Sequence, residues 1–369
     1  MKIAVIGGYS PSLINFRGPL LKALVSEGHE VYGIAPLDSQ DVPQKLADMG
    51  IKFIEAPIQR TGMNPLKDLA ALFALVKILK RIKPDTVLSY TIKPVIYGSI
   101  AAKLAGVKNI YSMITGLGYA FGQTSGKRGL LFKLVKTMYR VGLSCNNSVM
   151  FQNPDDRELF KNIGIIPQNK LTVVTNGSGV DLDHYTSSPV PEGGPVFLCI
   201  SRLLKEKGVR EFAAASVNLK KKYPQAKFRL VGPYDLGPDS LSDALIENWQ
   251  DNGVQYIGPV EDVREELKNC SVYVLPSYRE GTPRSVLEAM ATGRPVVTTD
   301  ATGCRETVIE GRNGFMVPVQ DVPALELAME RFILQPDLMQ RMGTASLEYI
   351  AEKFDVNKVN ATIMKAMGL

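Results

Sequence analysis

Short runs of apolar and β-branched residues alternate along the chain with longer segments in which apolar positions recur at helical spacing. The first pattern predicts buried strands, and the second predicts amphipathic helices. Strands are predicted over residues 2–7, 30–35, 52–57, 86–90, 109–114, 148–153 and 171–176, and again over residues 195–201, 227–232, 254–258, 271–277, 294–300 and 314–318. After the third strand, a helix is predicted over residues 66–82, with one apolar face formed by Leu69, Leu72, Phe73, Val76 and Leu79.

The predicted strands are almost continuously apolar, which favours parallel sheets that helices cover on both faces. A chain of 369 residues is too long for one ordinary core, and its most Pro/Gly/Ser-rich segment, residues 187–196, separates the two series of strands. We therefore predict an α/β fold of two Rossmann-like, doubly wound parallel-sheet domains, residues 1–187 and 188–351, facing a central cleft. Ligands of such sheets bind at the carboxyl ends of the strands.

Scattered cysteines and rare histidines argue against several classes of site. The four cysteines show no CxxC spacing, which fits buried thiols in a reducing compartment better than disulfides or a zinc site. With only two histidines, neither a His-rich metal site nor a His-based triad is expected. Residues 1–10 read as a strand and a glycine turn rather than a signal peptide, and the apolar stretch 69–79 is too short to span a membrane. A cytoplasmic protein is expected.

The net charge of +6 is unevenly distributed. Residues 56–154 carry fourteen Lys and Arg against two acids, a balance of +12, so the remaining residues carry −6. Such a field predicts an anionic partner for the N-terminal half. Within it, residues 127–143 interleave five basic residues with apolar ones. This stretch suits the surface of an anionic membrane, and a core-facing helix with a solvated basic side is the alternative.

The first predicted strand runs into Gly7 and Gly8 ahead of a helix. Backbone N–H groups at the start of a helix can bind a phosphate. The glycines do not form a GxGxxG pattern, and no acidic residue ends the second strand to bind a ribose, so a dinucleotide site is not indicated. An ordinary strand-to-helix turn explains the glycines equally well.

Two carboxylates stand close together in the segment YREGTPRSVLEAMATGRPVV, residues 278–297. Thr282 and Pro283 predict a helix start there, with Thr282 as the N-cap, so Glu280 lies in the loop before the helix and Glu288 in its second turn. Glu288 is flanked by apolar residues, and a buried carboxylate requires a partner. A pair of ribose hydroxyls is one such partner, and a neighbouring arginine is the other.

A second group of charges follows the strand 195–201. Arg202 comes directly after the strand, and Lys207 follows five residues later, before Gly208. If the loop brings them together, the two cations can bind a diphosphate. Taken alone, the segment reads more simply as a solvated loop of ordinary charges.

These segments together carry a resemblance to a known family. SRLLKEKG (201–208), LVGP (230–233), residues 275–308 and GRNGFMVP (311–318) resemble the C-terminal half of family 4 glycosyltransferases, which are retaining enzymes of the GT-B fold. The spacing of Glu280 and Glu288 matches that family's E-x7-E signature. The resemblance extends to the N-terminal half through residues 15–24, 60–69 and 89–107. It thus covers essentially the whole chain.

The resemblance implies roles for particular residues. Glu288 would hold the ribose hydroxyls of a nucleotide sugar, and Glu280 would line the sugar and phosphate site. Arg202 and Lys207 would bind the diphosphate and act with Glu280 in catalysis. Arg17 and Lys93 would hold the phosphates of the acceptor. The other donor-binding residues that the resemblance implies are Gly8, Gly281, Thr282 and Ser285. A C-terminal helix over residues 352–369 would cross back to the first domain.

The implied mechanism requires neither a metal nor any other cofactor. The two cations and the helix start after Glu280 would stabilise the negative charge of the leaving group. In this family the leaving phosphate itself is thought to take the acceptor proton. Asp181 and Asp183 form a DxD, but the segment resembles the family's "GVD" turn, and a metal role for it is the minor alternative. The family's N-terminal histidine near the sugar is missing, and residues 113–122 occupy the matching region.

The main hypothesis is therefore a retaining glycosyltransferase of polysaccharide biosynthesis, such as lipopolysaccharide or O-antigen, at the inner face of the cell membrane. It would move a sugar from a UDP-hexose or UDP-N-acetylhexosamine to a polyprenyl-diphosphate-linked saccharide, with UDP-GalNAc the preferred donor. A sugar-nucleotide epimerase or a phosphorylase on the same architecture is the alternative enzyme. A nucleic-acid-binding protein is disfavoured because aromatic residues are not interleaved with the basic ones.

Overall fold

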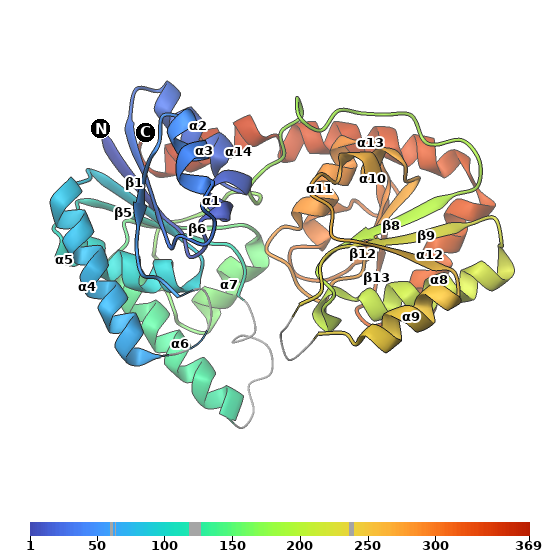
Figure 1. The fold of residues 1–369 in the computed structure, drawn as a ribbon, viewed down its shortest axis with the longest axis horizontal. Coiled ribbons are helices and arrows are strands. Elements are labelled where there is room, and N and C mark those ends of the chain that lie inside the picture. Colours follow the sequence, from blue (N-terminus) through green and yellow to red (C-terminus); the bar gives the residue numbers. More distant parts are fainter. Residues whose placement is uncertain (60–61, 63, 118–126, 236–239) are drawn as a thin grey trace. The chain divides into compact units, whose positions relative to one another are not determined.

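A computed structural model of the chain describes residues 1–59, 62, 64–117, 127–235 and 240–369. It divides into two compact units, of which unit 1 comprises Met1–Ser178 and Asn357–Leu369, and unit 2 comprises Gly179–Val356. Each unit is a parallel sheet with helices on both faces (Figure 1). The predicted α/β fold with two doubly wound parallel sheets is confirmed.

Unit 1 contains a seven-stranded sheet in the order β3-β2-β1-β4-β5-β6-β7. Its strands are β1 (Lys2–Ile6), β2 (Glu30–Ala35), β3 (Lys52–Glu55), β4 (Thr86–Tyr90), β5 (Asn109–Ile114), β6 (Ser148–Phe151) and β7 (Thr172–Val174). Its helical segments are α1 (Pro11–Asn15), α2 (Gly18–Ser26), α3 (Val42–Asp48), α4 (Pro65–Ile82), the π-helical turn η1 (Pro94–Gly98), α5 (Ser99–Leu104), α6 (Lys127–Ser144), α7 (Pro154–Asn162) and α14 (Val356–Ala366).

Unit 2 contains a six-stranded sheet in the order β10-β9-β8-β11-β12-β13. Its strands are β8 (Val196–Ile200), β9 (Lys227–Val231), β10 (Val254–Gly258), β11 (Val272–Leu275), β12 (Val296–Thr299) and β13 (Gly314–Val317). Its helices are the 3-10 turn η3 (Lys205–Lys207), α8 (Val209–Lys222), α9 (Asp243–Asp251), α10 (Arg264–Lys268), α11 (Arg284–Ala291), the 3-10 turn η4 (Arg305–Thr307), α12 (Val322–Leu334) and α13 (Asp337–Lys353).

The strand orders define where a ligand is expected in each unit. In unit 1 the chain leaves β1 toward β2 on one side, while β4 lies on the other side of β1. In unit 2 the same reversal occurs at β8, which lies between β9 and β11. The loops that follow two such neighbouring strands diverge to opposite faces and leave room for a ligand at the strands' carboxyl ends.

The unit 1 sheet buries apolar residues on both faces. Ile3 and Val5 of β1 pack in one cluster with α2 and with Ile363 of α14. Ala4 and Ile6 pack in a second cluster on the opposite face, with Leu75 and other residues of α4. This division follows from the two-residue repeat of a strand, which sends successive side chains to opposite faces.

Helix α4 is one of the longest in unit 1, and its start follows a capping pattern. Asn64 accepts hydrogen bonds from the backbone N–H groups of Leu66 and Lys67, at 3.1 and 3.2 Å. The predicted helix is therefore present, and Leu72, Val76 and Leu79 of its predicted apolar face pack against the sheet. Leu69 and Phe73 of the same set are exposed, because the buried stripe is centred on Leu75 and Leu79.

The unit boundaries differ from the predicted domain limits of 187/188 and 351/352. Residues 179–187 lie with unit 2, where the Tyr185 side chain joins the core. The backbone of Val180 is held from both sides, accepting from Val356 and donating to Phe354. Residues 352–356 belong to unit 2, and the C-terminal segment of unit 1 begins at Asn357 rather than at residue 352.

The four cysteines are free thiols. Three of them, Cys199, Cys270 and Cys304, are buried, and burial raises the pKa of each to about 12. Cys145 is half-buried. The prediction of buried thiols therefore applies to three of the four.

Candidate active site

The polar site of unit 2 lies where the loops after β8 and β11 meet. Gly208 ends the first loop with a backbone φ of 68°. A Cβ atom at this position would lie 1.9 Å from the carbonyl oxygen of Pro276, at the start of the second loop. Only glycine permits both the dihedral angle and this close approach. The glycine therefore allows Lys207 to reach the segment that carries Glu280.

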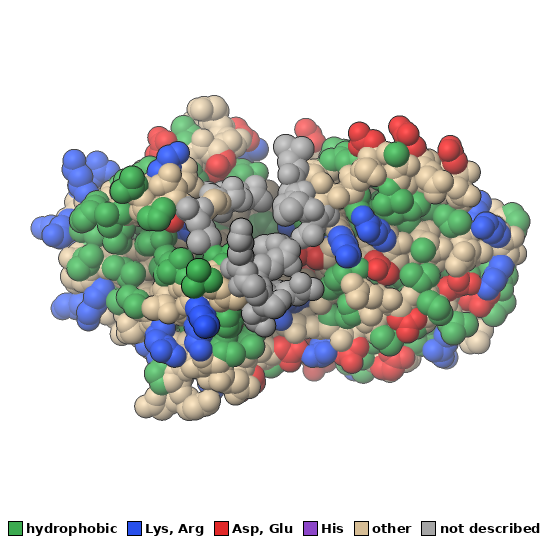
Figure 2. All heavy atoms as spheres, turned by 90° about the horizontal axis from the view of Figure 1, so that it is seen from below, with side chains coloured by type: hydrophobic (Ala, Val, Ile, Leu, Met, Phe, Trp, Pro, Cys, Tyr) green, Lys and Arg blue, Asp and Glu red, His purple; other side chains and the backbone are tan. Residues whose placement is uncertain are grey.

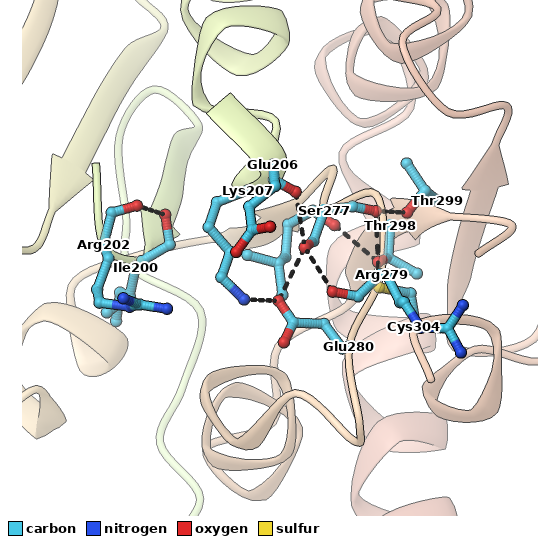
Figure 3. A network of polar contacts seen from close by, with 12 residues as sticks. Ile200, Arg202, Glu206, Lys207, Ser277, Arg279, Glu280, Thr298, Thr299 and Cys304 are labelled. Carbon is cyan, nitrogen blue, oxygen red and sulfur yellow. Dashed lines mark hydrogen bonds and ion pairs between the residues drawn. The ribbon is translucent and has the colours of Figure 1, made fainter. Parts of the chain in front are cut away.

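Lys207 and Glu280 form the centre of this site (Figure 3). Lys207 Nζ lies 2.6 Å from Glu280 Oε1, and the Ser277 hydroxyl donates to the same oxygen at 2.8 Å. Each side chain of the ion pair is 16% exposed, so the pair is partly shielded from solvent. Its attraction is stronger than that of an open surface pair. An ammonium group has three donors, so Lys207 can bind a further anion while it contacts Glu280.

The loop that carries Glu280 is held by backbone contacts. The Glu280 amide donates to the carbonyl of Thr302 at 2.9 Å, and the Tyr278 amide donates to Glu206 at 2.9 Å. Gly303 has a φ of 77°, and a Cβ there would lie 2.3 Å from the Glu280 carbonyl oxygen. These contacts fix the backbone on which Glu280 stands.

Glu288 lies in α11 and is only 8% exposed. Its Oε1 accepts a hydrogen bond from the Tyr185 hydroxyl at 2.9 Å and lies 2.8 Å from Arg284 Nε. Burial raises the pKa of Glu288 above its ordinary value, and the Arg284 charge and the Tyr185 hydrogen bond act against this rise. The internal arginine considered above is therefore present, and its ion pair with Glu288 is made to Oε1.

The start of α11 differs from the prediction by one residue. The helix begins at Arg284, and Pro283 precedes it with an extended backbone, φ −72° and ψ 107°. Gly281 is buried, and Thr282 and Ser285 are half-buried at the entry to the helix. Thr282 is thus a loop residue, because Pro283 takes the N-cap position.

Arg202 does not join the Lys207–Glu280 pair. Its Nη1 lies 2.7 Å from Asp235 Oδ2, and its side chain is 47% exposed. In Figure 3 the Arg202 side chain lies apart from the network around Ser277. Each of the two cations thus has its own carboxylate, and a diphosphate clamp by both stays a prediction.

The switch point of unit 1 contains Gly8, Tyr90 and Thr91. A Cβ atom on Gly8 would lie 3.0 Å from the Thr91 hydroxyl, so the loop after β1 packs closely on the end of β4. The amides of Gly7 and Ser10 already donate to the Ile34 carbonyl and to Asp38. Close packing therefore favours a glycine at position 8, and a phosphate contact by Gly8 stays a prediction.

The two cations predicted for the acceptor lie in different surroundings within unit 1. Arg17 is 2% exposed, stands 5.1 Å from the ring of Tyr90 and donates to the Ser178 hydroxyl at 3.2 Å. Lys93 forms an ion pair with Asp68 at 2.7 Å, in which the side chains are 14% and 10% exposed. No contact between Arg17 and Lys93 is found among the described residues. A joint role in binding one acceptor stays a prediction.

Comparison with known proteins identifies the family. Residues 194–335 match the family described as Glycosyl transferases group 1, and residues 13–153 match the family described as Glycosyl transferase 4-like. Over 366 residues, the chain is 32% identical to a Campylobacter jejuni protein named N,N'-diacetylbacillosaminyl-diphospho-undecaprenol alpha-1,3-N-acetylgalactosaminyltransferase, with 95% of each chain covered. The chain belongs to this glycosyltransferase family.

A second curated relative and several solved structures are also similar to this glycosyltransferase. An Escherichia coli protein named UDP-Gal:alpha-D-GlcNAc-diphosphoundecaprenol alpha-1,3-galactosyltransferase is 27% identical, over 77% of this chain and 75% of the relative. The Anabaena protein HepE, solved in complex with UDP, is 20% identical with a TM-score of 0.78 over the full length of both chains. A sucrose-phosphate synthase from Thermosynechococcus elongatus reaches 0.82 at 18% identity, over 99% and 98% of the two chains. These structural likenesses support the GT-B fold.

The DxD of the glycosyltransferase forms a turn. Asp181 Oδ1 accepts from the backbone N–H groups of Asp183 and His184, each at 3.0 Å. Within the parts of the chain that the structure describes, no group of three or more His, Cys, Asp and Glu side chains is arranged to hold a metal ion. Residues 118–122 of the segment 113–122, which matches the region of the missing family histidine, lie outside the described residues.

The sequence did not single out several residues that complete the site of the glycosyltransferase. Ser277 donates a hydrogen bond to Glu280. Asp235 forms the ion pair with Arg202. Tyr185 contacts Glu288 across 103 residues of sequence. Ser277 could have been predicted as a site residue, because it ends the predicted strand 271–277 and ligands bind at the carboxyl ends of such strands. No local pattern reveals the distant contact of Tyr185, because it depends on how the segment 179–187 folds back.

Proposed function

We propose that this glycosyltransferase transfers N-acetylgalactosamine from UDP-GalNAc, with retention of configuration, to a saccharide linked to polyprenyl diphosphate. The observation that carries the proposal is the pairing of Lys207 with Glu280 at the switch point of unit 2, with the buried carboxylate Glu288 in the helix that follows Glu280. The names of the two curated relatives, which specify undecaprenyl-diphosphate-linked acceptors, support the acceptor class. The first of them supports GalNAc.

The chemistry assigned to the site is charge stabilisation. As the bond between the sugar C1 and the diphosphate oxygen breaks, negative charge grows on UDP, and Lys207 stabilises it, with Arg202 as the second cation. The acceptor hydroxyl forms the new bond to C1, and its proton passes to the leaving phosphate. Glu280 lines the sugar and phosphate site with Gly281 and Thr282, and Glu288 accepts hydrogen bonds from the ribose. No metal or other cofactor takes part in the proposed reaction.

The remaining assigned residues bind the substrates. Gly8 approaches the donor phosphates, and Ser285 contributes to the donor site from the first turn of α11. Arg17 and Lys93 hold the acceptor diphosphate. For Lys93 this requires a phosphate to share or replace its contact with Asp68. Lys93 follows the end of β4, where a ligand of unit 1 is expected.

The acceptor class implies work at a membrane surface, and unit 1 has a face that suits it. Exposed apolar residues on α4 and α6 are Leu66, Leu69, Phe73, Leu130, Leu134 and Val141. Figure 2 shows hydrophobic and basic side chains together on the surface of unit 1, on the left. Such a mixture binds anionic lipid surfaces, each basic residue adding about 1 kcal/mol. We propose that this face docks on the inner leaflet of the cell membrane.

Two further observations bear on the membrane face. No described helix is long and apolar enough to cross a membrane. In α6 the residues Val135, Tyr139 and Leu143 pack in the core of unit 1, while Leu134 and Lys133 point outward. The helix thus has a core-facing side together with an outer side of mixed apolar and basic character. Lys127 and Arg128 lie where no side chain is described.

The decisive experiment is a transfer assay with the purified full chain in EDTA. UDP-GalNAc, UDP-GlcNAc and UDP-Gal are each incubated with a synthetic polyprenyl-diphosphate-linked saccharide, and the products are analysed by mass spectrometry and NMR. The expected result is transfer from UDP-GalNAc, with an α-linkage, which Glu288→Ala and Lys207→Ala each reduce at least tenfold. Arg17→Ala and Lys93→Ala are expected to weaken acceptor binding without changing donor binding.

The same assay separates the alternatives. Isomerisation of the UDP-sugar in the absence of acceptor would indicate an epimerase instead. Activity that appears only when a divalent cation replaces EDTA would contradict the metal-free reaction. Transfer from another nucleotide sugar would retain the transferase and overturn the assigned donor.

A further inference from the structure

Glu288 uses its two carboxylate oxygens unequally. Oε1 accepts the hydrogen bond of Tyr185 and forms the ion pair with Arg284. For Oε2, no hydrogen bond is found within the described residues, and it is not among the buried side-chain atoms that have no partner. The carboxylate is therefore held at one oxygen, while the other is left for a ligand.

A turn held by several hydrogen bonds fixes the position of Tyr185 next to Glu288. Its ring belongs to the core of unit 2 and is 8% exposed. The preceding turn is closed by the Asp181 carboxylate, which accepts from two backbone amides, and by the Tyr185 amide, which donates to the Asp181 carbonyl at 2.9 Å. Val180 is tied to residues 354 and 356. The tyrosine hydroxyl thus has little freedom to move away from Oε1.

The hydroxyl also keeps its proton. Burial, followed by the nearby Glu288 charge, raises the pKa of Tyr185 above its ordinary value. The phenol is therefore a hydrogen-bond donor at neutral pH. The His184 ring packs edge-on against the Tyr185 ring at 4.9 Å and further limits its rotation.

The contact matters because Arg284 offers an alternative arrangement. A guanidinium group can take both oxygens of a carboxylate in a bidentate pair. If Tyr185 did not hold Oε1, Glu288 would be free to turn toward Arg284 and to engage Oε2 as well. An oxygen paired in this way no longer accepts a hydrogen bond from a ribose hydroxyl at full strength.

We propose that Tyr185 is a positioning residue for donor recognition: its hydroxyl fixes Oε1 of Glu288 and so keeps Oε2 available to the ribose hydroxyls of the nucleotide. The inference rests on the proposed function, in which Glu288 binds the ribose. It adds a residue from outside the E-x7-E segment to the donor site.

The test compares UDP with 2′,3′-dideoxy-UDP, which lacks both ribose hydroxyls, by isothermal titration calorimetry on the full chain. The wild type is expected to bind UDP at least tenfold more tightly. Tyr185→Phe keeps the ring but removes the hydroxyl; it is expected to lower UDP affinity about fivefold to tenfold, the effect of losing one hydrogen bond to a charged group. Affinity for the dideoxy compound should stay within about twofold.

A matched control is available in the same unit. Tyr223 donates a hydrogen bond to Glu330 at 3.0 Å, and Tyr223→Phe removes an equivalent contact away from the site. This variant should bind both nucleotides as the wild type does. Unfolding followed by the fluorescence of Trp249, the one tryptophan of the chain, reports whether each variant retains the fold of unit 2.

The possible outcomes separate the inference from the proposed function. Equal binding of the two nucleotides by the wild type would overturn the ribose role of Glu288, and the inference with it. A tenfold preference that Glu288→Ala removes, but that Tyr185→Phe leaves unchanged, would overturn only the inference. An equal loss of both affinities in Tyr185→Phe would show that the tyrosine acts on the fold alone.

Discussion

At the scale of single residues, the site combines carboxylates whose surroundings differ. Glu280 is half-buried and paired with Lys207, so its charge has a nearby counter-ion. Glu288 is buried, and burial outweighs the effects of Arg284 and Tyr185 on its pKa. A group of this kind is a common feature of ligand sites, because the fold retains a poorly solvated charge for a partner to use.

The raised pKa of Glu288 predicts a pH-dependent stability of unit 2. A carboxyl group with a folded pKa above its unfolded value stabilises the folded state below the unfolded pKa, and this stabilisation is lost as pH rises through the folded pKa. Glu288→Gln removes the titration. The free energy of unfolding of the variant, relative to the wild type, should therefore increase as pH rises from 4 to 7, as measured by urea unfolding with Trp249 fluorescence. A pH-independent difference would contradict the raised pKa.

At the scale of secondary-structure elements, α4 joins the core of unit 1 to its surface. Leu75 and Leu79 are buried against the sheet, while Leu66, Leu69 and Phe73 are exposed on the outside. Hydrophobic side chains exposed along one stripe of a helix commonly mark an interaction surface. The ion pair between Asp68 and Lys93 fixes the helix to the loop after β4.

Helix α4 is predicted to contribute to lipid binding through its outer stripe. The double variant Leu69→Glu and Phe73→Glu should lower binding to phosphatidylglycerol vesicles at least tenfold, because two apolar contacts are lost and negative charge is added. Leu327→Glu with Leu334→Glu, which alters two exposed leucines of α12 in unit 2, is the matched control and should bind as the wild type does. Co-sedimentation at two salt concentrations measures the effect. Equal binding by the α4 variant and the control would exclude α4 from the docking face.

At the scale of the whole molecule, the chain forms two units, each built around a parallel sheet, and its C-terminal segment belongs to the first unit. Both sheets reverse their strand order once, at β1 and at β8, and the assigned residues lie mainly in the loops at these points. The segment Asn357–Leu369 brings Val359, Ile363 and Met367 into the unit 1 core. The last residues of the chain are thus part of the first unit's stability.

Shortening Ile363 should test this contribution. Ile363→Ala is expected to destabilise unit 1 by about 2–5 kcal/mol, the usual cost of a large-to-small change in a core. Hydrogen exchange should then accelerate in peptides from unit 1, while Trp249 fluorescence reports unchanged stability of unit 2. Leu334→Ala, at an exposed position, is the control. Destabilisation of unit 2 instead would contradict the assignment of this helix.

Much of the candidate site was already implied by local sequence. Lys207, Gly208 and Glu280 lie in the loops that follow β8 and β11, and the carboxyl ends of neighbouring parallel strands meet at one edge of a sheet. The sequence predicted the position of Arg202 after a strand but not its ion-pair partner, because an exposed side chain can reach more than one carboxylate. It contacts Asp235, which is 33 residues away and belongs to another loop.

The sequence by itself determined the fold class, the positions of the strands, the two-unit organisation and the E-x7-E pair, because each depends on periodicity, turn residues or spacing along one segment. Tertiary structure decided which oxygen of Glu288 is occupied, where the unit boundaries fall and which stripe of α4 packs. These features depend on contacts between residues far apart in the chain, such as Tyr185 with Glu288 or Ile363 with β1. Such contacts leave no regular spacing in the sequence, because their distance along the chain is set by the length of the intervening structure.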